Sequence, residues 1–159
     1  MTYSYGVYHY MENINMEFLT GDFTKCWRTW GFENIIPAYD KFYYIIDGEC
    51  IIIINNQKYI ARKGQLFLLP YNSVQTYYHF SENLVTKYWL HCTISCKNKD
   101  LLELVSLPHY IEVDDPDLVA SIFEKILYYA TDTENNIPAK LMQKSYMLQF
   151  GRNVVLGIS

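Results

Sequence analysis

Lys87, Trp89 and His91 alternate along an apolar segment, and this spacing could form one wall of a binding site. Side chains of a β-strand point alternately to opposite faces, so these three would share a face with Thr93. The opposite face would carry side chains typical of a packed core: Tyr88, Leu90, Cys92 and Ile94. An aromatic ring with a few polar groups beside it is typical of small-molecule sites. The alternative is that Trp89 only fills the core.

A second group of candidates precedes the first glycine turn of the same region. Trp27 and Arg28 fall in a segment, residues 24–30, whose composition predicts a strand. The guanidinium of Arg28 could pair with a ligand carboxylate or phosphate. An arginine among polar residues on a strand is, however, more often simply solvated.

The residue types needed for metal binding or catalysis do not fall into a recognisable pattern. The four histidines are scattered, and the four cysteines contain no CxxC pair. GxSxG, GxxxxGK[ST] and GxGxxG motifs are all missing from the sequence. Cys50 and Cys92 lie in apolar strand contexts that favour inert core thiols. We therefore expect no catalytic residue, no metal and no cofactor, and a chain that is not an enzyme.

The bulk composition indicates a folded domain that does not bind nucleic acid by itself. The chain has 159 residues, half of them apolar, and a formal net charge of −4. That charge disfavours direct DNA or RNA binding. Sixteen tyrosines suit either a ligand pocket or a β-rich core. We find no secretory signal and no long apolar span, so we expect a cytoplasmic protein with no membrane association.

Short strands separated by turn residues dominate the middle of the chain. After an arm over the first fifteen residues, strands are expected over residues 16–19, 24–30, 41–46, 49–54, 58–61, 66–69, 75–80 and 84–94. Asn55-Asn56 suits a tight primed hairpin because Asn tolerates positive φ. Gly64 would lie in a turn that leads into a buried strand, and Pro70 would end that strand. About eight antiparallel strands at this spacing predict a sandwich or barrel.

A helix follows the strands and begins at Asp115-Pro116, a capping residue and then proline at the first helical position. Apolar residues recur on one stripe of it: Val119, Ile122, Phe123, Ile126 and Leu127. We expect this stripe to make a homodimer, since two-fold pairing is the commonest solution for soluble oligomers. The alternative is that the stripe is buried against the barrel of a single copy. A second helix is expected over residues 139–150.

The order of motifs between Asp40 and Ile94 resembles the N-terminal effector-binding and dimerisation domain of AraC-type transcription regulators. The motifs are FYYIIDGE at residues 42–49, KGQLFLLPYN at residues 63–72 and YWLHC at residues 88–92. The resemblance implies a cupin-like double-stranded β-helix, or jelly-roll barrel, followed by one or two α-helices. It also implies that Trp89 stacks on a ligand such as a sugar, and that Tyr77 donates a hydrogen bond to it.

The sequence departs from the metal-binding cupin pattern at the positions that hold the metal. Where those enzymes have H-x-H, this chain has Pro37-Ala38-Tyr39-Asp40, and Gln75 stands where a histidine would follow Pro70. Transition metals need several N, O or S ligands at one place. The expectation is therefore a metal-free sensor. The alternatives are a cupin-type enzyme, such as a sugar isomerase or dioxygenase, and a stand-alone carbohydrate-binding barrel.

The expected domain organisation is an arm plus ligand-binding barrel over residues 1–96, then a linker and dimerisation helices over residues 97–159. The helix-turn-helix DNA-binding domain that the resemblance implies is absent from this chain. The expected partners are a small-molecule effector and a second copy, with DNA contacted only through that further domain. The candidate ligand-binding residues are Trp89, Tyr77, Trp27, Arg28, Lys87 and His91.

Overall fold

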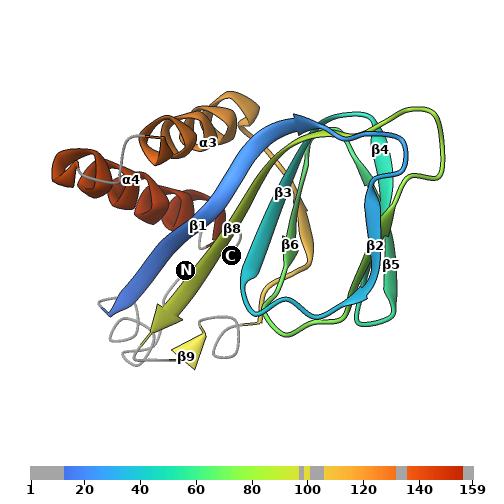
Figure 1. The fold of residues 1–159 in the computed structure, drawn as a ribbon, viewed down its shortest axis with the longest axis horizontal. Helices are drawn as coiled ribbons and strands as arrows, with labels where there is room; N and C mark the ends of the chain where they lie inside the picture. Colours follow the sequence, from blue (N-terminus) through green and yellow to red (C-terminus); the bar gives the residue numbers. More distant parts are fainter. Residues whose placement is uncertain (1–12, 97–98, 101–105, 132–135, 156–159) are drawn as a thin grey trace.

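The computed structural model describes residues 13–96, 99–100, 106–131 and 136–155. Figure 1 shows two β-sheets facing each other, with two helices on the outer face of one of them. The strands are β1 (Ile14–Lys25), β2 (Gly31–Ile35), β3 (Asp40–Asp47), β4 (Glu49–Ile54), β5 (Gln57–Arg62), β6 (Gln65–Leu69), β7 (Gln75–Tyr78), β8 (Thr86–Cys96), β9 (Lys99–Asp100) and β10 (Tyr110–Glu112). The helices are α3 (Pro116–Ala130) and α4 (Ile137–Phe150), and α4 continues into the π-helical turn η1 (Gly151–Val155).

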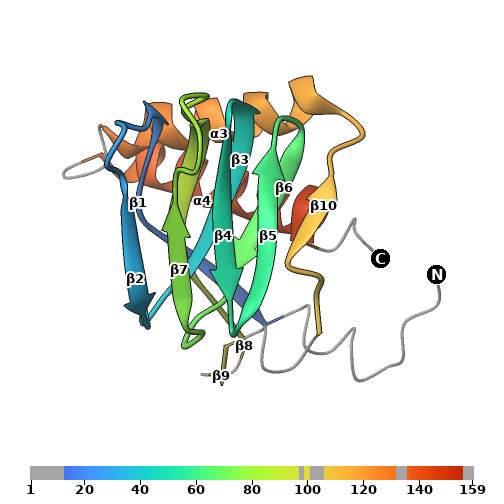
Figure 2. The same cartoon turned by 90° about the vertical axis from the view of Figure 1, so that its right-hand side faces the viewer.

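The chain alternates between the two sheets, and this gives the fold its topology. One sheet has the order β1-β8-β3-β6-β10, with β9 paired to β8, and the other has the order β2-β7-β4-β5. All pairings are antiparallel. Figure 2 shows the second sheet in front of the first, with the helices behind both. The first eight of these ten strands, β1 to β8, lie four in each sheet and form a jelly roll, which is the architecture of cupins. The predicted fold class is confirmed.

Two predicted turns are present as expected. Asn55 and Asn56 have φ values of 47° and 68°, and they join β4 to β5 in a hairpin with the positive φ values of a primed turn. Gly48, between β3 and β4, has φ of 74°, and a Cβ there would collide with the backbone carbonyl of Leu84. Glycine is therefore required at Gly48 by both its conformation and its surroundings.

The strand prediction fails near the start of the barrel. β1 is one long strand to Lys25, and residues 26–30 form a turn closed by the backbone hydrogen bond from Trp30 to Trp27. The predicted strand over residues 24–30 is therefore wrong, and β2, β9 and β10 were not predicted. Pairing with β8 runs from Ile14 to Lys25 and joins the residues between the two predicted strands into one strand. Residues 1–12 of the predicted arm lie outside the described residues.

The predicted start of the first helix is confirmed. The Asp115 carboxylate accepts a hydrogen bond from the Leu118 backbone N–H at 3.1 Å, and Pro116 occupies the first turn. The second helix begins two residues earlier than predicted, because the Asn136 side chain caps it by accepting from the Ala139 N–H at 3.1 Å. No helix among the described residues is long and apolar enough to cross a membrane.

The molecule has two cores, one on each face of the larger sheet. The inner core lies between the sheets and includes Tyr43, Ile52 and Phe67. The outer core lies between the larger sheet and the helices, and it contains Val119, Ile122, Phe123 and Ile126, with Leu127 packed against it. The predicted dimerisation stripe is therefore used inside one copy. For its four buried residues the structure has the alternative arrangement given above, burial against the barrel of a single copy, because a helix beside a large apolar sheet face buries its stripe there first.

Candidate functional site

Two buried lysines and a group of aromatic rings occupy the inner face of the larger sheet. The predicted alternation on β8 is present, with Lys87, Trp89 and His91 on the inner side and Leu90 and Ile94 in the outer core. On β3, Lys41 pairs with His91, Tyr43 with Trp89 and Ile45 with Lys87. This register therefore places Lys41 and Tyr43 of β3 beside the predicted binding residues of β8.

The ammonium group of Lys87 lies among aromatic rings. Lys87 is 3% exposed, and its Nζ lies 4.0 Å from the ring centroid of Tyr43 and 5.1 Å from that of Trp30. The ring centroid of Trp89 is 5.6 Å away. Each ring face attracts a cation through its quadrupole. Lys87 makes no hydrogen bond and no salt bridge within the described part of the chain.

Lys41 occupies the neighbouring position and is even more buried, at 1% exposure. Its Nζ donates a hydrogen bond to the Tyr77 hydroxyl at 3.3 Å and lies 5.0 Å from the centroid of that ring. Tyr77 comes from β7 in the opposite sheet, and its ring packs edge-on against the ring of Tyr43 at 5.9 Å between centroids. The predicted residue Tyr77 therefore joins the same cluster and connects the two lysines.

Burial lowers the pKa values of Lys41, Lys87 and His91, and neighbouring positive charges add to this for Lys41 and His91. Burial, with a smaller contribution from Lys87, lowers the pKa of Lys41 to about 8. Burial also lowers the pKa of Lys87 to about 8, against a small opposing effect of the Cys26 and Cys50 thiols. Burial, followed by the two lysines, lowers the pKa of His91 to about 4. At neutral pH both lysines are thus cationic and His91 is neutral.

Trp89 and His91 lie where the cluster comes closest to solvent. Both are half-buried, as is Tyr39, whose ring stacks on His91 at a centroid distance of 4.7 Å. The indole of Trp89 lies 5.0 Å from the His91 ring, and its Nε1 donates to the Thr24 hydroxyl at 3.0 Å. That hydrogen bond to β1 holds the Trp89 ring in place. The partly exposed rings form the side from which a ligand could reach the lysines.

Trp27 and Arg28 are not brought to this cluster. Both lie in the turn after β1, where Trp27 is 60% exposed. The Arg28 guanidinium forms an exposed salt bridge of 2.7 Å with Glu82. The sequence prediction placed them on a strand beside the other candidates, and the turn separates them from the barrel interior.

Three residues of the cluster were not among the predicted site residues: Trp30, Lys41 and Tyr43. A signal for two of them exists in β3, where Lys41, Tyr43 and Ile45 alternate with core residues as Lys87 and Trp89 do on β8. A lysine inside an otherwise apolar strand is unusual, because burying an ammonium group is unfavourable. Trp30 carries no such signal, since a turn rather than a strand directs it inward.

The position that would bear a metal ligand in related barrels carries an amide. Gln75 is fully buried, and its amide nitrogen donates to the Ser73 hydroxyl at 3.0 Å and to the Pro70 carbonyl at 3.2 Å. Its Oε1 accepts no hydrogen bond from the described residues. Within those residues no group of three or more His, Cys, Asp or Glu side chains is arranged to hold a metal ion.

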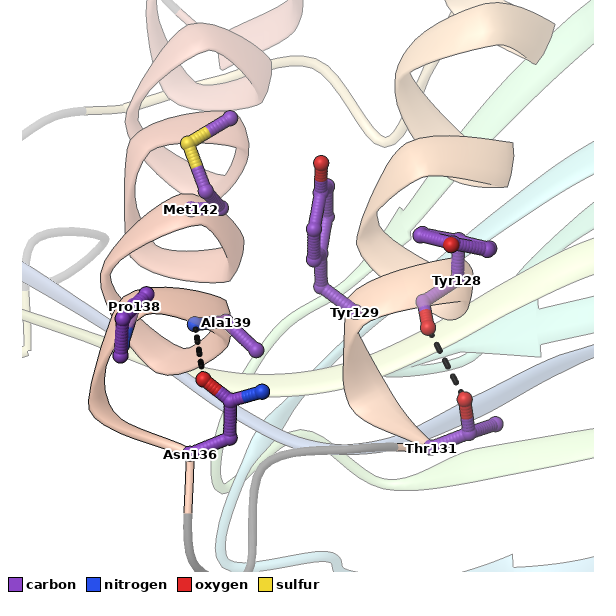
Figure 3. Close-up of a pocket in the computed structure, with 7 residues that line it drawn as sticks. All are labelled: Tyr128, Tyr129, Thr131, Asn136, Pro138, Ala139 and Met142. Carbon is purple, nitrogen blue, oxygen red and sulfur yellow. Dashed lines mark hydrogen bonds between the residues drawn. The ribbon is translucent and has the colours of Figure 1, made fainter.

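A hollow lies between the end of α3 and the start of α4, away from the interior cluster (Figure 3). It has a volume of about 430 Å³ and is lined by Tyr128, Tyr129, Thr131, Asn136, Pro138, Ala139 and Met142. Figure 3 shows two of its polar groups engaged locally: Asn136 caps α4, and the Thr131 hydroxyl donates to the Tyr128 carbonyl at 2.9 Å. With no charged lining residue, this hollow is the weaker candidate for a specific ligand site.

A jelly roll of this size either fills with side chains or holds one small ligand, and this one gathers charged and aromatic side chains in its interior. The sequence model of the AraC-like ligand binding domain matches residues 37–150. This chain therefore belongs to the AraC-like ligand-binding domain family, as its motifs predicted, and is a ligand-binding regulatory domain. No curated protein matches the sequence.

Solved structures with partial similarity include several cupin barrels. YhaK from Escherichia coli is 18% identical with a TM-score of 0.40, and the match covers 64% of this chain and 41% of that one. A cupin 2 conserved barrel domain protein from Leptotrichia buccalis is 18% identical with a TM-score of 0.39, over 57% and 44%. The Cnp3 cupin domain of Schizosaccharomyces pombe is 16% identical with a TM-score of 0.35, over 47% and 49%. The chain spans about half the length of the first structures that it matches.

Proposed function

We propose that this chain is the effector-sensing domain of a bacterial AraC-type transcription regulator, and that it binds its effector inside the jelly roll. The carrying observation is the interior cluster, in which Lys41, Lys87 and Tyr77 place polar atoms among aromatic rings. A bound molecule would lie against Trp89 and the buried lysines. A sugar would use the ring of Trp89 and the hydroxyl of Tyr77. The role is binding without catalysis and without a cofactor, in the cytoplasm.

The contacts of β3 and β8 support a route from the ligand to the helices. On the inner side these strands carry Tyr43 and Trp89, and on the outer side Tyr88 stacks on Phe123 of α3 at 5.4 Å between ring centroids. The Tyr88 hydroxyl also donates to the Glu124 carboxylate of α3 at 2.7 Å. A ligand that shifts β8 would therefore also move the surface on which α3 packs. Packed cores transmit such shifts because they deform little.

Transcriptional control would also require pairing of copies and a DNA-binding unit. The buried stripe of α3 is not available for pairing, but α4 presents an exposed apolar row of Ile137, Leu141 and Leu148 at helical spacing. We propose that this row contributes to a homodimer. DNA would be contacted through a separate helix-turn-helix domain, since the net charge of −4 disfavours direct contact.

Tryptophan substitution tests the proposed binding site. The purified chain is screened by thermal shift against sugars, sugar acids and small carboxylic acids, and affinities of the hits are measured by calorimetry. Trp89→Ala should weaken binding by at least tenfold, because truncating a stacked aromatic costs about 2 kcal/mol. Trp27→Ala is the matched control: it removes the same side chain from the exposed turn and should bind as the unmodified chain does.

Folding of the variants is checked by circular dichroism, and Trp89→Phe serves if Trp89→Ala does not fold. Trp89→Phe keeps a ring but loses the hydrogen bond to Thr24. Equal ligand affinity in the folded Trp89 variants and in Trp27→Ala would place the effector elsewhere. A screen without any hit would count against a small-molecule sensor.

A further inference from the structure

Among the described residues, the two buried lysines have no carboxylate partner of the kind that buried cations usually have. Charged side chains in protein interiors are normally paired or hydrogen-bonded. Neither Lys41 nor Lys87 forms a salt bridge with any carboxylate of the described residues. Asp40 is next to Lys41 in sequence, but its Oδ1 accepts from the Tyr71 backbone N–H at 2.7 Å. The interior therefore holds two cations, and neither forms a salt bridge with a described residue.

Hydrogen-bond capacity points the same way. Each ammonium group carries three N–H donors. Among the described residues, the pair makes a single hydrogen bond, from Lys41 to the Tyr77 hydroxyl. The Tyr43, Trp30 and Trp89 rings offer faces to Lys87 but no strong acceptor. Most donors of the pair are thus left for an acceptor that the described residues do not supply.

The other titratable groups around the lysines do not neutralise them. His91 is held neutral at pH 7 by burial and by the lysines, which lower its pKa to about 4. Burial raises the pKa of Cys26, and raises that of Cys50 to about 12, so both thiols are protonated. Burial likewise raises the pKa of Tyr43 and of Tyr77. The site as a whole is dicationic and bordered by apolar rings.

We propose that the effector is a small organic anion, whose carboxylate or phosphate group binds between Lys41 and Lys87 while its apolar part lies against Trp30 and Trp89. This inference rests on the proposed function, since it names the ligand class of the same site. An oxyanion supplies the charge and the several acceptors that two ammonium groups require. The surrounding rings favour a ligand whose remaining surface is apolar or flat.

Matched pairs of ligands test the charge requirement directly. The full chain is titrated by calorimetry at pH 7 with benzoate and benzamide, hexanoate and hexanamide, and phenyl phosphate and phenol. D-glucose and D-ribose represent neutral sugars. We expect the anion of at least one pair to bind about tenfold or more tightly than its neutral partner, because a hydrogen bond to a charged group is worth more than a neutral one. The phosphate and carboxylate pairs distinguish the two sources of the charge.

Lysine variants locate the effect. Lys41→Met and Lys87→Met keep an unbranched chain of similar length and remove the charge, and each should abolish the preference for the anion. Lys58→Met, on the exposed side of β5, is the matched control and should retain the preference. A preference that survives in both buried-lysine variants would overturn the proposal.

The remaining outcomes separate this proposal from the proposed function. Binding of a neutral sugar with no response to any anion would overturn the anionic ligand class and leave the sensing barrel intact. Binding of no probe in either class, together with an empty thermal-shift screen, would overturn both.

Discussion

Removing the charge of Lys87 should stabilise the ligand-free protein, which is an unusual outcome for a buried position. Lowering a lysine pKa from 10.5 to about 8 corresponds to about 3 kcal/mol of unfavourable free energy for the charged form. The lost attraction to the surrounding rings offsets about 1–2 kcal/mol of that. Lys87→Met should therefore raise the free energy of unfolding at pH 7 by roughly 1–2 kcal/mol.

The pH dependence of folding stability provides a second, independent test. Because the folded pKa of Lys87 lies below the unfolded value, the unfolded chain binds more protons between about pH 8 and 10.5. The stability contribution of Lys87 is least favourable below pH 8 and improves as the pH rises through this window. Lys41 has the same direction. The advantage of Lys87→Met over the unmodified chain should accordingly shrink between pH 7 and pH 9.5.

Urea unfolding followed by tryptophan fluorescence measures these differences, with midpoints compared at constant slope. Lys58→Met, which removes an exposed lysine, should change stability by no more than about 0.5 kcal/mol at either pH. Several other titratable groups surround the lysine, so the variant is compared with the unmodified chain at each pH: Cys26, Cys50, Tyr43, Tyr77, Lys41 and His91. A destabilised Lys87→Met, or a difference that does not change with pH, would refute the reasoning that an uncompensated ammonium group is buried here.

Two further predictions concern the framework. Gly48→Ala should destabilise the fold by roughly 3 kcal/mol or more in urea unfolding, because both the positive φ and the Leu84 carbonyl oppose a Cβ. Gly64→Ala, where φ is 89° but the space is open, should cost only about 1–2 kcal/mol, and equal losses would contradict the steric argument. In sedimentation at high micromolar concentration, Leu148→Lys should release monomers with unchanged circular dichroism, whereas Ile126→Lys should unfold the chain because Ile126 is fully buried. A monomeric unmodified chain would overturn the α4 dimer.

Much of the fold follows from local patterns in the sequence. Strict alternation on β8 separates Lys87 and Trp89 from Leu90 and Ile94, and the structure keeps that division. The Asn55-Asn56 turn and the Asp115-Pro116 helix start each depend on a few neighbouring residues, so they are readable without knowledge of the fold. The family was recognisable because three motifs, at residues 42–49, 63–72 and 88–92, occur in a fixed order.

What the sequence did not predict depends on partners far along the chain. Lys41 joins the site because β3 pairs with β8 in a register that sets it opposite His91. Trp27 and Arg28 leave the site because pairing with β8 extends β1 and moves the turn to residues 26–30. The α3 stripe has the spacing of a helix contact, but periodicity does not tell whether the contact is with the same copy or another.

Gly21 gives β1 a consequence beyond sheet pairing. A Cβ on Gly21 would lie 2.6 Å from the Trp89 carbonyl oxygen and 3.3 Å from a side-chain carbon of Leu127 in α3. The bare backbone of β1 at this point therefore allows both the Trp89 carbonyl of β8 and the Leu127 side chain of α3 to approach it closely. A side chain here would collide with the Trp89 carbonyl oxygen and press on Leu127, whereas glycine leaves both groups in place. A substitution at Gly21 would thus disturb the pairing of β1 with β8 and the packing of α3 at the same time.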